Sequence, residues 1–158
     1  MAMIIKDSGT GRGLFTDRKY LAGDVVMPLK GIRITREEIE KLDKVEQGNM
    51  LQIGRDLFLN MEGHSEIFIN HSCNPNCYVK AVVNSGFLIA LRPIDKDEEL
   101  SYDYSLTSTD TPEEWHLNCQ CHKFYCRREI SGFDTMPEEA KKEAEKKQLL
   151  PRYITTQK

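Results

Sequence analysis

The sequence lacks a strong excess of charge of either sign. Acidic and basic residues are mixed along its 158 positions, and the formal net charge is −3. A protein that binds nucleic acid mainly through electrostatics would carry a basic surplus or a basic stripe. The composition therefore argues against that class of protein, and we expect no direct sequence-specific binding of nucleic acid.

Long hydrophobic runs are also missing. A membrane-spanning helix needs about 20 consecutive apolar residues, and no segment of the sequence approaches that length. The first residues do not show the pattern of a secretory signal peptide. These absences predict a soluble intracellular protein, cytoplasmic or nuclear according to the organism, with no membrane partner. They leave the oligomeric state open.

Cysteine occurs five times, an odd number that suits a closed set of disulfides poorly. Clustered cysteines in a reducing compartment more often bind metal or take part in chemistry. Three of them, Cys119, Cys121 and Cys126, lie within eight residues in a short polar segment. A structural zinc site takes four thiolate or imidazole ligands in a tetrahedron. We therefore predict one structural zinc ion, whose binding helps to order this segment.

The fourth zinc ligand has to come from elsewhere in the chain. Four side chains qualify by type: Cys73, Cys77, His116 and His122. The competing interpretation, cysteines buried as small apolar side chains, is typical of a lone cysteine. Three cysteines within eight residues, beside two more within five, favour zinc.

Short strands interrupted by glycines dominate the body of the chain. Apolar and β-branched runs predict strands at 4–5, 14–15, 24–29, 50–53, 56–60, 77–83, 87–92 and 98–105. Asn84, Ser85 and Gly86 are expected to form a three-residue hairpin turn. The predicted fold class is therefore mainly β with short helices, and not a parallel doubly wound sheet.

Two helices are expected, each marked by a capping box. Thr35 and Glu38 start a short helix, and Thr135 and Glu138 start a C-terminal helix that ends at Pro151. The inner face of the first helix is predicted to carry Ile39, Leu42 and Val45. We expect the second helix to be solvated and to pack only weakly on the body. The alternative is a substrate-docking element.

Three polar or aromatic patterns carry the candidate chemistry. The stretch "FINHSCNPNC" from Phe68 places many hydrogen-bonding side chains between two apolar runs. The stretch "GTGRG" from Gly9 to Gly13 permits close backbone approach to a ligand but lacks the context of a dinucleotide fingerprint. Tyr102 and Tyr104 stand two apart on a predicted strand and therefore face one side. Such a pair is more often packed core than a catalytic pair.

Together these stretches resemble the SET-domain protein lysine methyltransferases. "GRGLF", "FINHSCNPNC" and "EELSYDY" resemble the first, third and fourth family motifs, and "CQCHKFYC" resembles the cysteine-rich post-SET segment. The resemblance implies small curved sheets around a pseudoknot, an exception to unknotted connectivity. It implies a SET domain over 1–110, a post-SET zinc-binding segment over 111–128 and a C-terminal helical extension over 129–158.

The resemblance also implies roles for single residues. S-adenosylmethionine would be held by Thr10, Gly11, Arg12, Gly13, Asn70, His71, Gln120 and Phe124. The zinc ligands would be Cys73, Cys119, Cys121 and Cys126. Cys77 would then be a buried thiol at the start of a strand. Tyr104 aligns with the catalytic tyrosine. Tyr102 aligns with the position that influences how many methyl groups are added, which implies mono- or dimethylation of a lysine in a histone or other basic protein.

Three positions depart from the family pattern. Leu29 stands where an aromatic residue is usual, Ile67 where an arginine often precedes the third motif, and Asp97 where a turn glycine is common. The first two keep an alternative open, a SET-like zinc module that binds protein without turnover. A zinc-containing nucleic-acid module is a further alternative, which the acidic balance disfavours.

Overall fold

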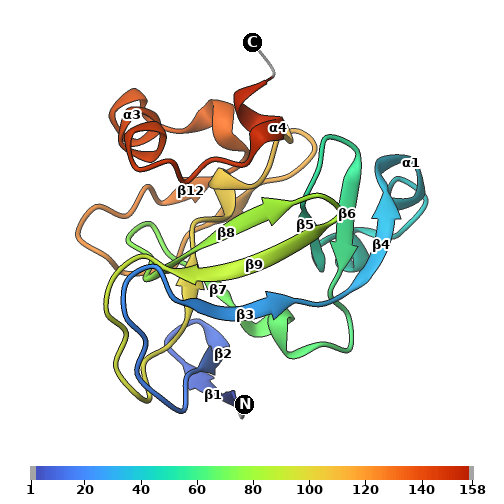
Figure 1. The fold of residues 1–158 in the computed structure, drawn as a ribbon. Coiled ribbons are helices and arrows are strands. Elements are labelled where there is room, and N and C mark those ends of the chain that lie inside the picture. Colours follow the sequence, from blue (N-terminus) through green and yellow to red (C-terminus); the bar gives the residue numbers. More distant parts are fainter. Residues whose placement is uncertain (1–2, 157–158) are drawn as a thin grey trace.

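A computed structural model of the chain describes residues 3–156, and its residues form small sheets with short helices between and after them (Figure 1). The strands are β1 (Ile4–Ser8), β2 (Gly11–Phe15), β3 (Val25–Leu29), β4 (Ile32–Thr35), β5 (Met50–Gln52), β6 (Leu57–Asn60), β7 (Asn70–His71), β8 (Cys77–Val82), β9 (Ser85–Ala90), β10 (Ser101–Tyr102), β11 (Leu117–Asn118) and β12 (Glu129–Ile130). The helices are α1 (Arg36–Ile39), α2 (Lys44–Gln47), α3 (Glu138–Lys146) and α4 (Arg152–Thr155), with 3-10 turns η1 (Ser65–Phe68), η2 (Tyr104–Leu106) and η3 (Phe133–Thr135). The predicted fold class, mainly β with short helices and a C-terminal helix, is confirmed.

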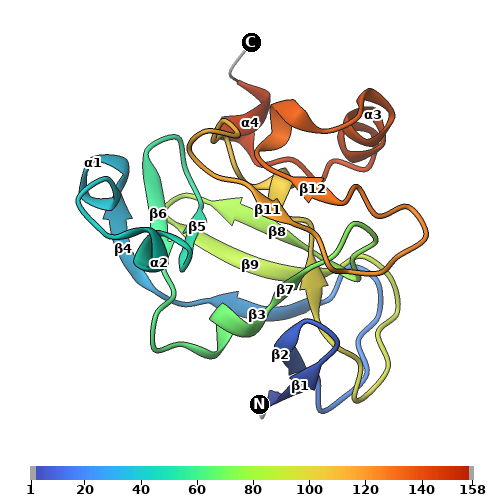
Figure 2. The same cartoon turned by 180° about the vertical axis from the view of Figure 1, so that it is seen from behind.

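The strands pair in small groups. β3, β9 and β8 form one antiparallel sheet, and β4, β6 and β5 form another. β1 pairs with β2, and β11 pairs with β12, each time antiparallel. Figures 1 and 2 show α3 and α4 at the end of the molecule opposite the β1–β2 hairpin. No described helix has the length and apolar character that crossing a membrane requires.

A parallel pairing joins two distant segments at the centre. β7 lies beside β10, with Asn70 opposite Ser101 and His71 opposite Tyr102. The buried side chain of Asn76 supports this pairing, because its amide donates to the Glu99 carbonyl at 2.8 Å and its oxygen accepts from the Ser101 N–H at 2.9 Å. A buried amide needs such partners. This explains why a polar turn can lie inside the fold.

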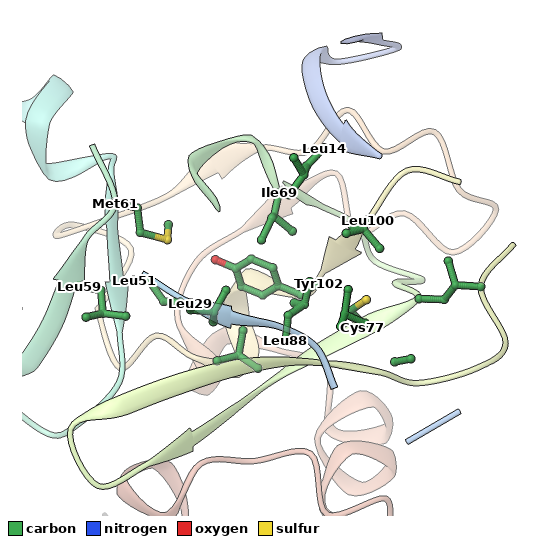
Figure 3. Close-up of a cluster of buried hydrophobic side chains, with 14 of the residues drawn as sticks. Leu14, Leu29, Leu51, Leu59, Met61, Ile69, Cys77, Leu88, Leu100 and Tyr102 are labelled. Atoms are coloured by element: carbon green, nitrogen blue, oxygen red, sulfur yellow. The ribbon is translucent and has the colours of Figure 1, made fainter. Parts of the chain in front are cut away.

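The main core surrounds this pairing. Leu14, Leu88 and Leu100 are completely buried, and each contributes roughly 1.5–3 kcal/mol relative to an exposed side chain. Figure 3 shows the ring of Tyr102 in the middle of this cluster. Cys77 is buried at the start of β8, as expected, and burial raises the pKa of its thiol to about 12.

Two predicted strand features are wrong. The loop between β8 and β9 has two residues, because Val82 pairs with Ser85, and Asn84 takes the left-handed backbone with φ of 57°. The strand predicted to reach residue 105 ends at Tyr102. Asp103 accepts the Ser105 N–H at 3.1 Å and starts the η2 turn, so the chain leaves the strand before Tyr104.

The first helix is also shorter than predicted. The capping box of Thr35 and Glu38 is present, but α1 ends at Ile39. Asp43 accepts two backbone N–H groups and starts a second helix, α2, with a capping box of its own. Val45 was predicted to lie on the inner face of the first helix, but it is 81% exposed, because the chain turns between the two helices.

The C-terminal segment differs most from its prediction. The hydroxyl of Thr135 donates to the Gly132 carbonyl and does not cap a helix. The N-cap residue of α3 is Pro137 instead. Pro151 precedes α4 and does not end α3. The predicted solvated helix corresponds to α3, in which Ala144 is the one buried residue. The chain continues into α4, which was not predicted and whose Tyr153 and Ile154 are buried.

Candidate active site and metal centre

Two tyrosines form the centre of the candidate site. The rings of Tyr102 and Tyr104 lie 4.7 Å apart, centroid to centroid, although only the first belongs to a strand. The Tyr104 hydroxyl donates to the Ile69 carbonyl at 2.7 Å, and the backbone carbonyl of Ile69 immediately precedes Asn70. Burial raises the pKa of both phenols, so both hydroxyls stay protonated at neutral pH. They can act as hydrogen-bond donors and dipoles, and not as bases.

A third aromatic ring faces the tyrosines. The ring of Trp115 lies 6.4 Å from that of Tyr104, and all three rings line one cavity of about 640 Å³. We did not predict a role for Trp115. Two features of the sequence could have pointed to it: it is the only tryptophan of the chain, and it stands shortly before the cysteine cluster. A tryptophan there is available to a ligand, because bulky aromatic side chains commonly line binding pockets.

The cavity lies between two walls with the tyrosines beside them. One wall is formed by the segment from α1 to β6, and the other by the segment from Thr107 to Leu117. An ion pair joins the two walls, with Arg36 Nη1 2.8 Å from Asp110 Oδ1. Glu114 adds a carboxylate, and a hydrogen bond from the Thr111 backbone lowers its pKa. Glu40 lines the cavity as well, so several carboxylates border it, beside the cations of Arg36 and Lys44.

Asn70 connects β7 with the β1–β2 hairpin. Its amide nitrogen lies 2.7 Å from Glu99 Oε1, 3.1 Å from the Arg12 carbonyl and 3.4 Å from Ser8 Oγ. A side chain at Gly13 would overlap the Glu99 carboxylate, so the backbone approaches closely there. The structure thus brings the glycine stretch, with Thr10, Gly11, Arg12 and Gly13, next to Asn70. We did not predict a role for Glu99. The one feature of the sequence that could have pointed to it is its position in the stretch "EELSYDY" with the two tyrosines.

The ring of His71 lies between the tyrosine and the cysteines. Its Nδ1 accepts the Tyr104 N–H at 3.2 Å, so in the neutral ring the proton is on Nε2, which is 3.3 Å from Cys73 Sγ. Burial, the largest cause, lowers the pKa of His71 to about 4. The imidazole is therefore neutral at pH 7. Its ring is turned toward the cysteine cluster, so a ligand beside Asn70 would meet the backbone of His71.

The four cysteines Cys73, Cys119, Cys121 and Cys126 come together in space. All their Sγ atoms lie within 4.8 Å of one another. Ligands at 2.3 Å from a tetrahedral zinc ion stand roughly 3.8 Å apart, and the Cys73 and Cys119 sulfurs are 3.7 Å apart. The donor set and its spacing therefore fit zinc. The other candidate ligands, Cys77, His116 and His122, are not part of the cluster. Cys77 is in the core, and His116 Nδ1 lies 2.8 Å from the Pro112 carbonyl.

The last two predicted cofactor residues are open to solvent. Gln120 is exposed between two cysteines, and Phe124 is 93% exposed, with its ring 4.8 Å from that of Tyr125. Both belong to the loop that the cysteines gather. They are available to a ligand but are not packed into the group around Asn70.

Comparison with known proteins decides the family. The family model described as "SET domain" matches residues 11–105, more than half of the chain. The chain belongs to the SET-domain family. The match begins in the glycine stretch and ends one residue after Tyr104, so it includes the first, third and fourth motifs predicted from the sequence.

Three curated relatives of this SET domain are methyltransferases by name. The chain is 36% identical over 131 residues to histone-lysine N-methyltransferase 2B of Homo sapiens, which covers 75% of this chain and 5% of the human protein. It is 33% identical over 132 residues to the histone-lysine N-methyltransferase trithorax of Drosophila virilis, covering 77% of this chain and 3% of that protein. It is 28% identical over 144 residues to the histone H3-lysine(4) N-trimethyltransferase ATX1 of Arabidopsis thaliana, covering 83% of this chain and 13% of that protein. The chain thus spans only a small part of the length of these relatives.

Proposed function

We propose that this chain is a protein-lysine N-methyltransferase that uses S-adenosylmethionine as the methyl donor. The carrying observation is the position of Tyr104. Its ring lines the cavity, and its hydroxyl is bonded to the carbonyl directly before Asn70. A lysine side chain that enters from the cavity would therefore meet this tyrosine at the Asn70 segment.

The chain's own residues account for activation of the amine. A free lysine has a pKa near 10.4, so the neutral amine costs roughly 4–5 kcal/mol at pH 7. The aromatic rings of Tyr102, Tyr104 and Trp115 offer a poorly solvated lining, which favours loss of the proton to solvent. The neutral Tyr104 hydroxyl would orient the amine, so its contribution is positioning and electrostatics. When bound, S-adenosylmethionine supplies the methyl group as a sulfonium.

The cofactor is proposed to lie on the other side of Tyr104, near Asn70 and the glycine stretch. The proposed contacts are Thr10, Gly11, Arg12, Gly13, Asn70, His71, Gln120 and Phe124. Space beside Gly11 is open, since a Cβ there would meet no atom within 4 Å. The Glu99 carboxylate next to Asn70 gives this side a negative charge, which suits a ligand with ammonium and sulfonium groups.

The four-cysteine cluster is proposed to hold one structural zinc ion. Four thiolates complete the tetrahedron and leave no open position for catalysis. Zinc would hold the loop from Cys119 to Cys126 against Cys73, two residues after His71. The metal would thereby position the exposed Gln120 and Phe124 near the cofactor.

The proposed substrate is a lysine in a histone or another basic protein. The carboxylates of Glu40, Asp110 and Glu114 outnumber the cations of Arg36 and Lys44 at the cavity, and this negative balance favours a basic segment. The relatives whose names give a histone support the same class, and a histone substrate would imply a nuclear location. We propose mono- or dimethylation because Tyr102, which aligns with the family position that influences product state, lines the cavity. One relative is named a trimethyltransferase, so the product state needs its own test.

The alternative, a SET-like module without turnover, rested on Leu29 and Ile67. Leu29 is buried in the core and is not among the residues that line the cavity, whereas Ile67 lines it as an apolar side chain. Neither residue removes a polar group that the proposed reaction uses. The cavity therefore gives no support to loss of turnover.

One experiment tests the function directly. The protein is incubated with labelled S-adenosylmethionine and a set of histones and other lysine-rich proteins, and mass spectrometry locates methylated residues. Methyl-lysine should form with the unmodified protein and be lost with Tyr104→Phe. Cofactor binding without methyl-lysine on any protein of the set would favour the binding module.

A further inference from the structure

The cavity wall from Thr107 to Leu117 has little regular structure of its own. It contains one turn after Thr111 and the first residue of β11, Leu117, at its end. A segment of this kind loses much conformational entropy when it is held in one position. Something outside the segment must hold it, and the residues behind it belong to the C-terminal extension.

Four consecutive residues of the extension contact the back of this wall. Ile130 in β12 pairs with Leu117, and the Ser131 hydroxyl donates to the Trp115 carbonyl. The Phe133 N–H donates to the Ser108 carbonyl at 2.8 Å. Each of these wall residues also lines the cavity. The wall is thus held from behind along most of its length.

The third residue in this row, Gly132, lies against Asp110. A Cβ atom at Gly132 would overlap the carbonyl group of Asp110, so only glycine permits this approach. Asp110 is the wall residue that forms the ion pair with Arg36 across the cavity. The position of Gly132 therefore affects where that ion pair is made.

Tyr153 in α4 holds the two walls together at their base. Its hydroxyl lies 2.8 Å from the Gln52 carbonyl in β5 and 2.8 Å from the Thr107 carbonyl. Gln52 belongs to one wall and Thr107 begins the other. Tyr153 is 8% exposed, and burial raises the pKa of its phenol, so the hydroxyl proton stays available to these two carbonyls.

We propose that the extension positions the substrate wall, with Tyr153 and Gly132 as positioning residues, and that it does so independently of the cysteine cluster. The inference rests on the proposed function for its kinetic consequence only. The wall ends at Leu117, before the first cysteine of the loop. The segment between the SET domain and the extension would then be held at two places. The extension would hold the wall at the substrate cavity, and the cysteines would hold the loop near the proposed cofactor site.

Trp115 gives a direct readout, because it lies in the wall and is the only tryptophan of the chain. Its fluorescence is measured on the free protein, without substrate or cofactor, for Tyr153→Phe and Gly132→Ala. The matched control is Tyr78→Phe, since Tyr78 is in β8 and lines no part of the cavity. We expect roughly a twofold rise in quenching of Trp115 by acrylamide in both variants, as for a locally opened segment. The circular dichroism spectrum of each variant should match that of the unmodified protein, as expected if the sheets remain folded.

A zinc chelator tests whether these two places are held independently. Chelation of the unmodified protein should leave the quenching of Trp115 close to its starting value. A rise as large as that in Tyr153→Phe would overturn independence. Quenching in both variants equal to that of Tyr78→Phe would overturn the positioning role, whether or not the protein methylates anything.

Kinetics separate positioning from general loss of structure. In Tyr153→Phe, the KM for a substrate peptide should rise about fivefold, the effect typical of one lost hydrogen bond, while kcat and the KM for S-adenosylmethionine stay within about twofold. An equal fall of kcat for all substrates would contradict a role confined to the wall. Absence of methyl transfer in the unmodified protein would refute the proposed function and leave the fluorescence result valid.

Discussion

Arg127 donates two parallel hydrogen bonds to the carboxylate of Asp103, at 2.7 and 2.6 Å, and both side chains are largely buried. Asp103 stands between Tyr102 and Tyr104, and Arg127 directly follows the last cysteine of the cluster. The backbone N–H of Arg127 also lies 3.4 Å from Cys73 Sγ. This pair therefore connects the cysteine loop with the tyrosines.

Arg127→Met should destabilise the protein by breaking this pair. The Asp103 carboxylate would stay buried without its partner, and loss of one member of a buried pair costs on the order of 3 kcal/mol. Denaturant unfolding measures the change in free energy. The matched control is Arg128→Met, because Arg128 is exposed and should change the unfolding free energy little. Similar values for the two variants would show that the pair contributes nothing.

The cysteine cluster predicts one zinc ion per chain. Metal analysis of the purified protein should find zinc in equimolar amount, and Cys73→Ser should lose most of it. Cys77→Ala is the control, since this core thiol lies outside the cluster and its loss should reduce stability without releasing metal. Full zinc content in Cys73→Ser would show that another residue is the fourth ligand.

Tyr104→Phe should reduce methyl transfer by at least about a hundredfold, the loss typical of one well-placed electrostatic donor. Cofactor affinity should change little, because the hydroxyl donates to the Ile69 carbonyl and is proposed to act on the amine. Asn70→Ala should show the reverse, with weaker cofactor binding. Calorimetric titration with the cofactor and turnover assays separate the two effects. Wild-type turnover in Tyr104→Phe would mean that another group orients the amine.

Tyr102→Phe should shift the products toward higher methylation states. Tyr102 lines the cavity, and its hydroxyl is proposed to hold a water molecule that leaves no room for a methylated amine. Immobilising one ordered water costs at most ~2 kcal/mol, and a difference of that size is enough to change a product ratio tenfold. Mass spectrometry at long incubation times gives the ratio. Efficient trimethylation by the unmodified protein would show that this tyrosine does not limit the product.

The sequence by itself determined the features that depend on local physics. Residue type and periodicity over a few positions were enough to predict the strands of the β8–β9 hairpin and the capping box of Thr35. The close spacing of the last three cysteines was enough to predict that they cluster. The order of the motifs along the sequence was enough to predict that the chain belongs to the SET-domain family. Local rules failed where a neighbouring residue offered a better partner, as when Asp103 ended the strand before Tyr104.

Only the tertiary structure decided which distant groups meet. Nothing local in the sequence predicts that Arg127 reaches Asp103, that Glu99 reaches Asn70, or that Tyr153 lies between two cavity walls 101 and 46 residues away in sequence. Such contacts depend on the path of the whole chain, here the parallel pairing of β7 with β10 and the return of the C-terminal helices. Their hydrogen bonds form only after the core has placed both partners, which is why residue patterns alone do not show them.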